Sequence, residues 1–188
     1  MFEPGLGMIY LGQSSLCHNF FPQNAILLLR SELASMGISG ALAGMFNDRL
    51  VYLYHSYRER SVLTSFLPMP EQKLFGSNIA LVILCVKYGS GKARSVLLGE
   101  LERSSMPEEE RKCREASILQ RIEEFEKDNY AVWEDEHRHW NICFPLVGGS
   151  QVYGLSFLIG ADSRPDHAKL FLKCSSLAAE MRKILTKS

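Results

Sequence analysis

GALAGMFNDRLVYLY, residues 40–54, is the stretch of sequence that decides the fold. Two strand-like segments, Gly40–Phe46 and Arg49–Tyr54, lie on either side of Asn47 and Asp48, which readily adopt the backbone conformations of a hairpin turn. The stretch therefore predicts a β-hairpin. A hairpin in turn predicts a sheet whose strands run antiparallel.

Helical patterns lie on both sides of this hairpin. Before it, apolar residues recur at helical spacing from Ala25 to Met36 and stop at Gly37, where a C-cap glycine is expected. After it, Ser77 is a suitable N-cap for an apolar helix over Asn78–Tyr88. The many β-branched residues in that second segment would also suit a buried strand, so a strand is the alternative there.

The remaining elements follow from the same signals. Pro107 opens a long charged helix, because proline is favoured in the first turn of a helix. Gly148 and Gly149 are expected to form the turn of a second hairpin. In chain order we expect a strand at Ser61–Leu67, a turn at Gly89–Ala93, helices at Val96–Arg103 and Glu108–Asp128, strands at Trp140–Val147 and Gln151–Ile159, and a helix at Pro165–Lys187.

Each of the two long helices shows one apolar stripe. In the charged helix the stripe is narrow, and its charges, with Glu124 and Asp128 facing basic neighbours, predict a solvated face rather than a binding patch. The inner residues are Ile118, Ile122 and Phe125 in that helix, and Leu170, Leu172, Leu177, Ala178, Met181, Ile184 and Leu185 in the last one. Together the elements predict an α+β domain whose strands pair locally into one antiparallel sheet flanked by helices.

Charge and hydropathy exclude several classes of function. Lysine plus arginine number 21 and aspartate plus glutamate also number 21, so the chain has no cationic field to attract nucleic acid by itself. Ile79–Val86, the longest apolar run, is far shorter than the roughly 20 residues that cross a bilayer. We therefore expect a soluble cytoplasmic protein without a membrane partner.

The cysteines indicate a reducing compartment. They are odd in number, widely spaced and without a CxxC pair, so neither a disulfide framework nor a zinc site is expected. They are Cys17, Cys85, Cys113, Cys143 and Cys174.

No catalytic motif is present in the sequence. A metal site formed by Glu136, His137 and His139 is an alternative to three solvent-exposed side chains, which is the simpler interpretation. Cys85 and Cys143 have apolar flanks that indicate inert core thiols rather than nucleophiles. We therefore predict no enzyme, no metal and no cofactor.

Three longer phrases resemble a known family. They are FFPQNAILLLRSELASMGISGALAGMFNDRLVYLYHSYR at 20–58, FGSNIALVILCVKYG at 75–89 and FEKDNYAVWEDEHRHWNICFPLVGGSQVYGLSFLIG at 125–160. Their order and local patterns resemble the GAF-like effector-binding domain of IclR-type transcription regulators. The resemblance implies a lead-in segment at 1–21 followed by one effector-binding domain at 22–188.

The resemblance also implies a ligand pocket. It would use backbone amides at Ala41, Leu42, Ala43 and Gly44, the helix start at Ser77 and Asn78, and inward side chains at Asn141, Phe157 and Ile159. Where family members carry histidine, cysteine and two serines, this sequence has Ser77, Asn141, Phe157 and Ile159. These departures predict a mostly apolar hollow and a ligand more apolar or larger than a simple keto-acid, the alternative being that side chains fill the hollow.

Function follows as an expectation from the same resemblance. It implies a ligand-sensing and oligomerisation domain, a dimer or tetramer, of a regulator that reaches DNA only through a winged helix absent from this chain. The expectation is therefore either an excised fragment or a stand-alone relative. A purely structural dimerisation module, in which the apolar face of the first helix and the glycine-rich lead-in pack against a partner chain, is the alternative.

Overall fold

An antiparallel sheet of six strands lies at the centre of the computed structural model, in the order β3-β2-β1-β6-β5-β4. The structure describes residues 23–46, 49–57, 60–62, 74–134, 139–149, 151–160 and 167–186. The strands are β1 (Ser39–Phe46), β2 (Arg49–Tyr57), β3 (Arg60–Val62), β4 (Ala131–Glu134), β5 (Trp140–Gly148) and β6 (Gln151–Ile159). The helices are α2 (Gln23–Met36), α3 (Asn78–Tyr88), α4 (Ser90–Glu102), α5 (Glu108–Asp128) and α6 (His167–Leu185), with a short 3₁₀ turn η1 (Leu74–Gly76).

The two predicted hairpins are confirmed, and a pairing between them makes the sheet continuous. The strands β1 and β2 pair with each other, as do β5 and β6. The sheet becomes one because β1 pairs with β6, with Ala41 opposite Ser156 and Gly44 opposite Tyr153. The expectation of purely local pairing therefore misses the β1–β6 junction, which joins strands far apart in the sequence.

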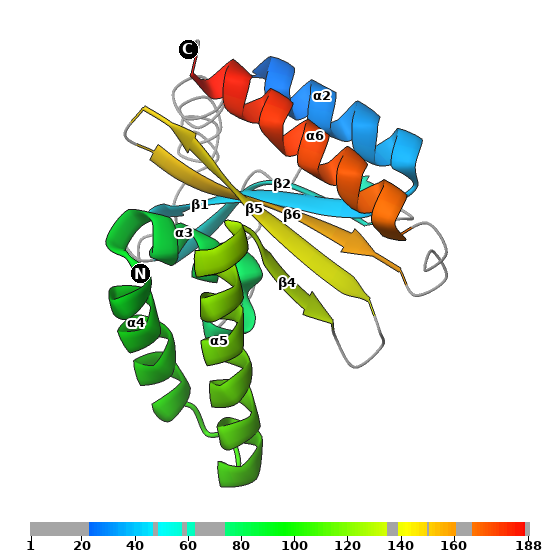
Figure 1. Cartoon of the computed structure of the whole chain (residues 1–188). Helices are drawn as coiled ribbons and strands as arrows, with labels where there is room; N and C mark the ends of the chain where they lie inside the picture. Colours follow the sequence, from blue (N-terminus) through cyan, green and yellow to red (C-terminus); the bar gives the residue numbers. More distant parts are fainter. Residues whose placement is uncertain are drawn as a thin grey trace, which may run out of the picture.

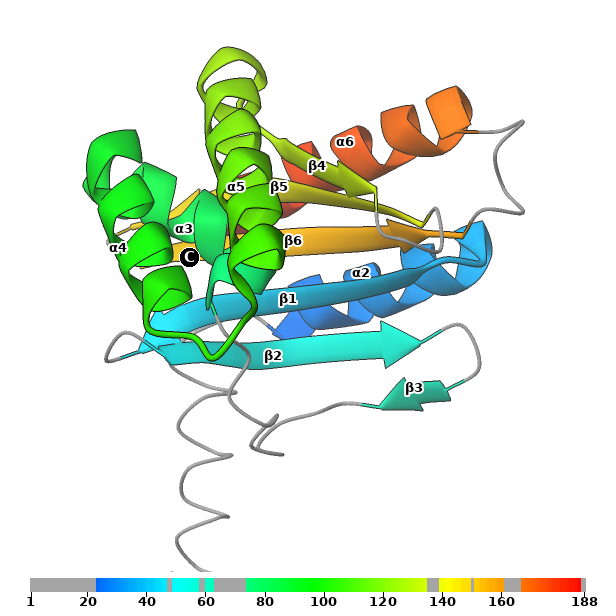
Figure 2. The same cartoon turned by 90° about the horizontal axis from the view of Figure 1, so that it is seen from below.

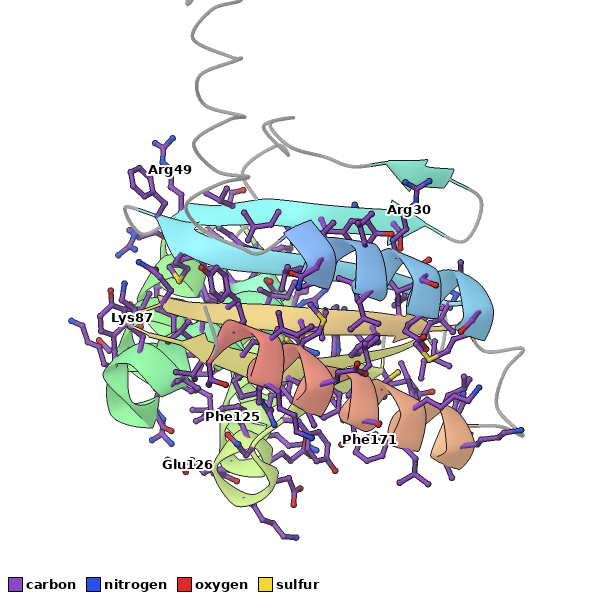
Figure 3. The ribbon with its side chains drawn as sticks, turned by 90° about the horizontal axis from the view of Figure 1, so that it is seen from above. Arg30, Arg49, Lys87, Phe125, Glu126 and Phe171 are labelled. Carbon is purple, nitrogen blue, oxygen red and sulfur yellow. The ribbon has the colours of Figure 1, made fainter. Side chains whose placement is uncertain are left out.

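Helices cover both faces of the sheet (Figure 1). On one face, α2 and α6 lie side by side across the strands, as Figure 3 shows from above. On the other, α3 packs against β5 and β6, and α4 and α5 lie outside it (Figure 2). Each face has its own apolar core, so we name these the upper core, under α2 and α6, and the lower core, around α3.

Several predicted helices are confirmed by the structure. The left-handed φ of 65° at Gly37 ends α2 as expected. The segment after Ser77 is a helix, and the alternative of a buried strand is wrong there. Its Ser77 Oγ accepts a hydrogen bond from the Ala80 N–H at 3.2 Å, which is the predicted cap.

Other predictions need correction. The turn expected at Gly89–Ala93 is wrong, because Gly89 alone, with φ 81°, makes the bend and α4 begins at Ser90. The strand β4 was not predicted, since four residues carry little periodicity. Leu172 is 68% exposed and lies outside the apolar stripe of α6, where the buried Cys174 takes part instead.

Some predictions fall outside the described residues. They concern the lead-in at 1–21, the turn at Asn47 and Asp48, most of the strand expected at Ser61–Leu67, and the ends of the last helix at Pro165 and Lys187. Within the described ranges, no helix has both the length and the apolar character that crossing a bilayer requires.

Candidate ligand-binding site

A pocket of about 230 Å³ lies between the start of α3 and the lower face of the sheet. Both hairpins and the helix contribute to its wall, so it spans the β1–β6 junction. It is lined by Ser39, Gly40 and Ala41 of β1, Tyr52, His55 and Ser56 of β2, Asn141 of β5, Ser156 and Leu158 of β6, and Gly76, Ser77, Asn78 and Ile79 at the start of α3.

The first turn of α3 lines this pocket and contains backbone donors without an intrahelical partner. Ser77 Oγ caps the amide of Ala80, and the Ser77 carbonyl accepts from the amide of Leu81. Among the described residues, the amides of Asn78 and Ile79 have no acceptor. Uncapped amides at a helix N-terminus, together with the helix dipole, favour a bound anion.

A chain of hydrogen bonds links the pocket to α5 behind it. Arg121 Nη1 donates to Asn78 Oδ1 at 2.8 Å. Asn78 Nδ2 in turn donates to the Asn141 backbone oxygen at 3.0 Å and to Asn141 Oδ1 at 3.4 Å. Ser156 Oγ donates to the same Asn141 Oδ1 at 2.8 Å. The amide oxygen of Asn141 is therefore occupied, while its Nδ2 has no acceptor within the described part of the chain.

Arg121 is a buried cation. Its side chain is only 4% exposed, and its other donors reach the carbonyl oxygens of Phe75, at 3.3 Å, and Ser117, at 3.2 Å. Burial, and secondarily the charge of Arg114, lower the pKa of Arg121 to about 10, so it stays charged at neutral pH. The prediction that all charges of α5 form a solvated face is therefore wrong at this position.

The cation is held by neutral acceptors and by an aromatic ring. No carboxylate among the described residues forms an ion pair with Arg121. Its guanidinium carbon lies 5.5 Å from the centre of the Trp133 ring, and that of Arg114 lies at the same distance. Such contacts stabilise a cation by roughly 0.5–2 kcal/mol. The positive charge behind the pocket therefore has no ion-pair partner in the described structure, and Glu124 only partly offsets the lowering of its pKa.

His55 adds a titratable group to the wall. Burial lowers its pKa below the ordinary value of 6.5, so the imidazole is neutral at neutral pH. Its ring lies 5.7 Å from that of Tyr52, which also lines the pocket. No Asp or Glu is among the lining residues that the structure describes. The pocket therefore offers hydrogen-bond donors without a carboxylate that would repel an anion.

The structure brings together four of the predicted site residues. Ala41, Ser77, Asn78 and Asn141 all line the pocket. The amides of Ala41–Gly44 do not face it as predicted, because β1 pairs with β2 on one side and β6 on the other and its amides lie in the plane of the sheet.

Five predicted residues lie elsewhere. Leu42, Phe157 and Ile159 belong to the upper core, on the opposite face of the sheet. Ala43 lies in the lower core beyond the pocket, and Gly44 lies beside Tyr153. The prediction that Phe157 and Ile159 point inward is wrong, because neighbouring strand residues alternate between faces.

The residues one position away on β6 take their place. Ser156 and Leu158 line the pocket, and Ser39, Ser56, Tyr52 and His55 add further polar groups that the sequence did not single out. A hollow that is mostly apolar was expected, and this expectation is also wrong. The signal that could have revealed the register is the pair Ser156 and Asn141, two polar residues in otherwise apolar strands.

The buried thiols have the properties expected of core residues. Burial raises the pKa of Cys85 to about 11 and raises that of the fully buried Cys143 further still. In both cases the thiolate needed for nucleophilic attack is disfavoured. Of the alternative metal site, Glu136 and His137 lie outside the described residues, and the described residues contain no cluster of three metal-ligating side chains.

Comparison with known proteins identifies the fold. No protein-family model and no curated protein matches the sequence. An IclR-family transcriptional regulator from Brucella abortus is 21% identical with a TM-score of 0.68, over 98% of this chain and 69% of that one. The C-terminal domain of a putative transcriptional regulator from Vibrio cholerae is 16% identical with a TM-score of 0.61, over 88% of this chain and 99% of that domain.

A third structure contains a small acid. It is an IclR homologue from Microbacterium hydrocarbonoxydans complexed with 4-hydroxybenzoate, 13% identical with a TM-score of 0.63, over 88% of this chain and 68% of that one. Identities this low establish the fold alone. The chain therefore has the fold of the C-terminal domains of IclR-family regulators, and the predicted α+β class is confirmed.

Proposed function

We propose that this chain is the effector-binding domain of a transcription regulator and that its pocket binds a small organic anion. The observation that carries the proposal is a set of donors that have no acceptor in the described structure and belong to residues lining one pocket: the amides of Asn78 and Ile79 and the Nδ2 of Asn141. A carboxylate supplies the acceptors that these donors lack. The fold supports the proposal because its solved examples include transcription regulators.

The pocket favours a small ligand. Its volume of about 230 Å³ lies below the roughly 300–1,000 Å³ that is common for drug-sized ligands. The structural neighbour from Microbacterium hydrocarbonoxydans was solved with 4-hydroxybenzoate, a compact acid of this chemical class. We therefore propose a small carboxylate as the effector, and an aromatic acid of the size of 4-hydroxybenzoate would still be larger and more apolar than a simple keto-acid.

Regulation would follow from differential binding. An effector that binds one arrangement of paired domains better than another shifts the equilibrium between them, which changes operator affinity in a full-length regulator. The proposal includes a homo-oligomer, DNA contact through a separate winged-helix domain, a cytoplasmic location and no catalytic activity. In this proposal the residues of the pocket have one role, which is to bind the effector.

Calorimetric titration with a panel of small carboxylates, including 4-hydroxybenzoate, tests the proposal. We expect saturable heat with at least one acid, weakened about tenfold in Ser156→Ala, because the hydroxyl that holds Asn141 is lost. Ser176→Ala, an exposed serine of α6 on the opposite layer, is the matched control and should bind like the wild type. Absence of heat for every acid at millimolar concentration would overturn the proposal.

The alternative is a dimerisation module that packs through the apolar face of the first helix and the glycine-rich lead-in, and the helix face is not available for it, whereas the lead-in lies outside the described residues. Ala25, Leu29 and Leu33 of α2 are buried in the upper core of the same chain. Only Leu27 of that helix, 64% exposed, is an exposed large apolar residue in the described structure. Single exposed leucines are ordinary on protein surfaces and do not define an interface.

A further inference from the structure

Arg121 lies behind the pocket and does not line it, yet it ends the hydrogen-bond chain that reaches the pocket. A guanidinium has five N–H donors and no acceptor. Asn78 must therefore turn its Oδ1 toward Arg121, and the observed bond between Arg121 Nη1 and Asn78 Oδ1 is 2.8 Å long. This leaves only the Nδ2 of Asn78 to face β5.

The same logic fixes the next amide in the chain. Asn78 Nδ2 donates to the Asn141 backbone oxygen at 3.0 Å and to Asn141 Oδ1 at 3.4 Å, and Ser156 Oγ donates to the same Oδ1 at 2.8 Å. The two side-chain contacts together turn the Oδ1 of Asn141 toward Asn78 and Ser156. The Nδ2 of Asn141 then points away from both partners. Rotation of an asparagine amide by half a turn exchanges the positions of its oxygen and its nitrogen, so the neighbouring hydrogen-bond partners determine which of the two orientations it adopts.

We infer that Arg121 is a positioning residue that sets the ligand selectivity of the pocket: by dictating the orientation of Asn78 and, through it, Asn141, it makes Asn141 a donor and selects ligands that present acceptors. The inference rests on the proposed function and deepens it. A ligand that presents its own donors to Asn141 would leave both groups unsatisfied, which disfavours its binding.

Titration with two matched probes tests the selectivity. The probes are 4-hydroxybenzoate, whose carboxylate only accepts, and 4-hydroxybenzamide, whose amide group of similar shape also donates. We expect wild-type protein to prefer the acid by about tenfold or more. In Arg121→Gln the side chain both donates and accepts, so it no longer fixes Asn78, and the preference should fall to within about threefold.

Two further variants separate positioning from simple loss of charge. Arg121→Lys keeps a donor-only group and should keep most of the preference for the acid. Arg114→Gln removes the same charge from the same helix, at the same distance from the Trp133 ring, but from outside the hydrogen-bond chain. It should leave the ratio unchanged. Equal ratios in wild type, Arg121→Gln and Arg114→Gln would overturn the inference, as would equal losses in both glutamine variants.

A measurement without ligand keeps this inference separate from the proposed function. In wild-type NMR spectra the side-chain amide protons of Asn141 should exchange with water, whereas those of Asn78 should be protected. Arg121→Gln should shift both amide pairs, and Arg114→Gln should shift neither. If neither probe binds the wild type, the choice of an aromatic acid as ligand fails, and the NMR result alone decides the orientation. Protected Asn141 protons would overturn the inference.

Discussion

Gly154 of β6 lies directly against Ile79 in the first turn of α3. A Cβ at position 154 would come within 2.7 Å of Ile79 Cγ2 and 3.2 Å of Ile79 Cα, so the helix rests on the bare strand at this point. The close approach holds the start of α3 against the sheet, beside the pocket that its residues line.

Gly154→Ala should therefore destabilise the protein by about 1–3 kcal/mol, because the added methyl forces α3 away from β6. Chemical denaturation measures the effect. Gly91→Ala is the matched control: its Cβ meets nothing within 4 Å, and alanine in a helix is favoured over glycine. If both variants unfold at the same denaturant concentration, the close packing described here is not present in solution.

Ser77 has two separable roles, as the cap of α3 and as a wall of the pocket. Ser77→Ala should reduce the free energy of unfolding by about 1 kcal/mol, because the Ala80 amide loses its acceptor. Ser77→Asp should keep most of that stability, since aspartate is a good N-cap. Its carboxylate would nevertheless weaken binding of an anionic ligand about tenfold or more.

Thermal denaturation and titration of the same two variants distinguish these roles. The expected pattern is reduced stability in Ser77→Ala and reduced anion affinity with near wild-type stability in Ser77→Asp. Undiminished anion binding by Ser77→Asp would contradict the location of the ligand beside α3.

His55 should make stability depend on pH. Its folded pKa is lowered by burial, so below about 6.5 the unfolded chain binds a proton that the folded protein resists. The contribution of neutral His55 to the free energy of unfolding is thus fully present above pH 6.5, and it is lost as the pH falls through the pKa of His55 in the folded protein. Urea denaturation between pH 7 and 5 should show a fall in stability that is smaller in His55→Gln. The same slope in both proteins would assign the effect to other groups.

The cysteines should differ in reactivity. At pH 8 a thiol reagent should modify the exposed Cys113 quickly, whereas the buried Cys85, Cys143 and Cys174 should react only on unfolding. Peptide mapping by mass spectrometry measures each site separately. Burial raises the pKa of Cys174 to about 12, so it should resemble the other two. Rapid modification of Cys85 or Cys143 in the folded protein would revive the hypothesis of a nucleophilic cysteine.

Secondary structure was largely predictable where one local signal dominated. The hairpin β1–β2 and the cap at Ser77 follow from short-range preferences, and both are confirmed. The helix predicted at Val96–Arg103 is shorter than α4, because the first turn of α4, Ser90–Ala93, is rich in small residues that also suit a turn. In that case packing against α3 and α5 decides the boundary, which local sequence does not encode.

The register of β6 was not predictable from hydrophobicity. Both faces of the strand are covered by helices, so Phe157 and Leu158 are both apolar although they lie on opposite faces. Side chains of a strand alternate between its two faces, but when both faces are apolar the sequence does not show which residues belong to which face. On β6 the pocket residues are therefore Ser156 and Leu158, each one position before the residue that the resemblance implied.

Arg121 was missed for a related reason. It stands in a helix full of exposed charges, and composition alone does not separate it from them. Its spacing does, because positions 118, 121, 122 and 125 share one helix face, and the other three carry buried apolar residues. A charge within an apolar stripe is the signal that predicts a buried, hydrogen-bonded role.

The junction between β1 and β6 is the place where ligand binding should be easiest to detect by hydrogen exchange. The two ribbons of the sheet meet along this one line, and the pocket wall takes residues from both sides of it. A bound molecule would contact both hairpins, so its binding free energy would stabilise the pairing of β1 with β6. Hydrogen–deuterium exchange of the amides along Ser39–Gly44 and Tyr153–Leu158 is where filled and empty protein would differ most.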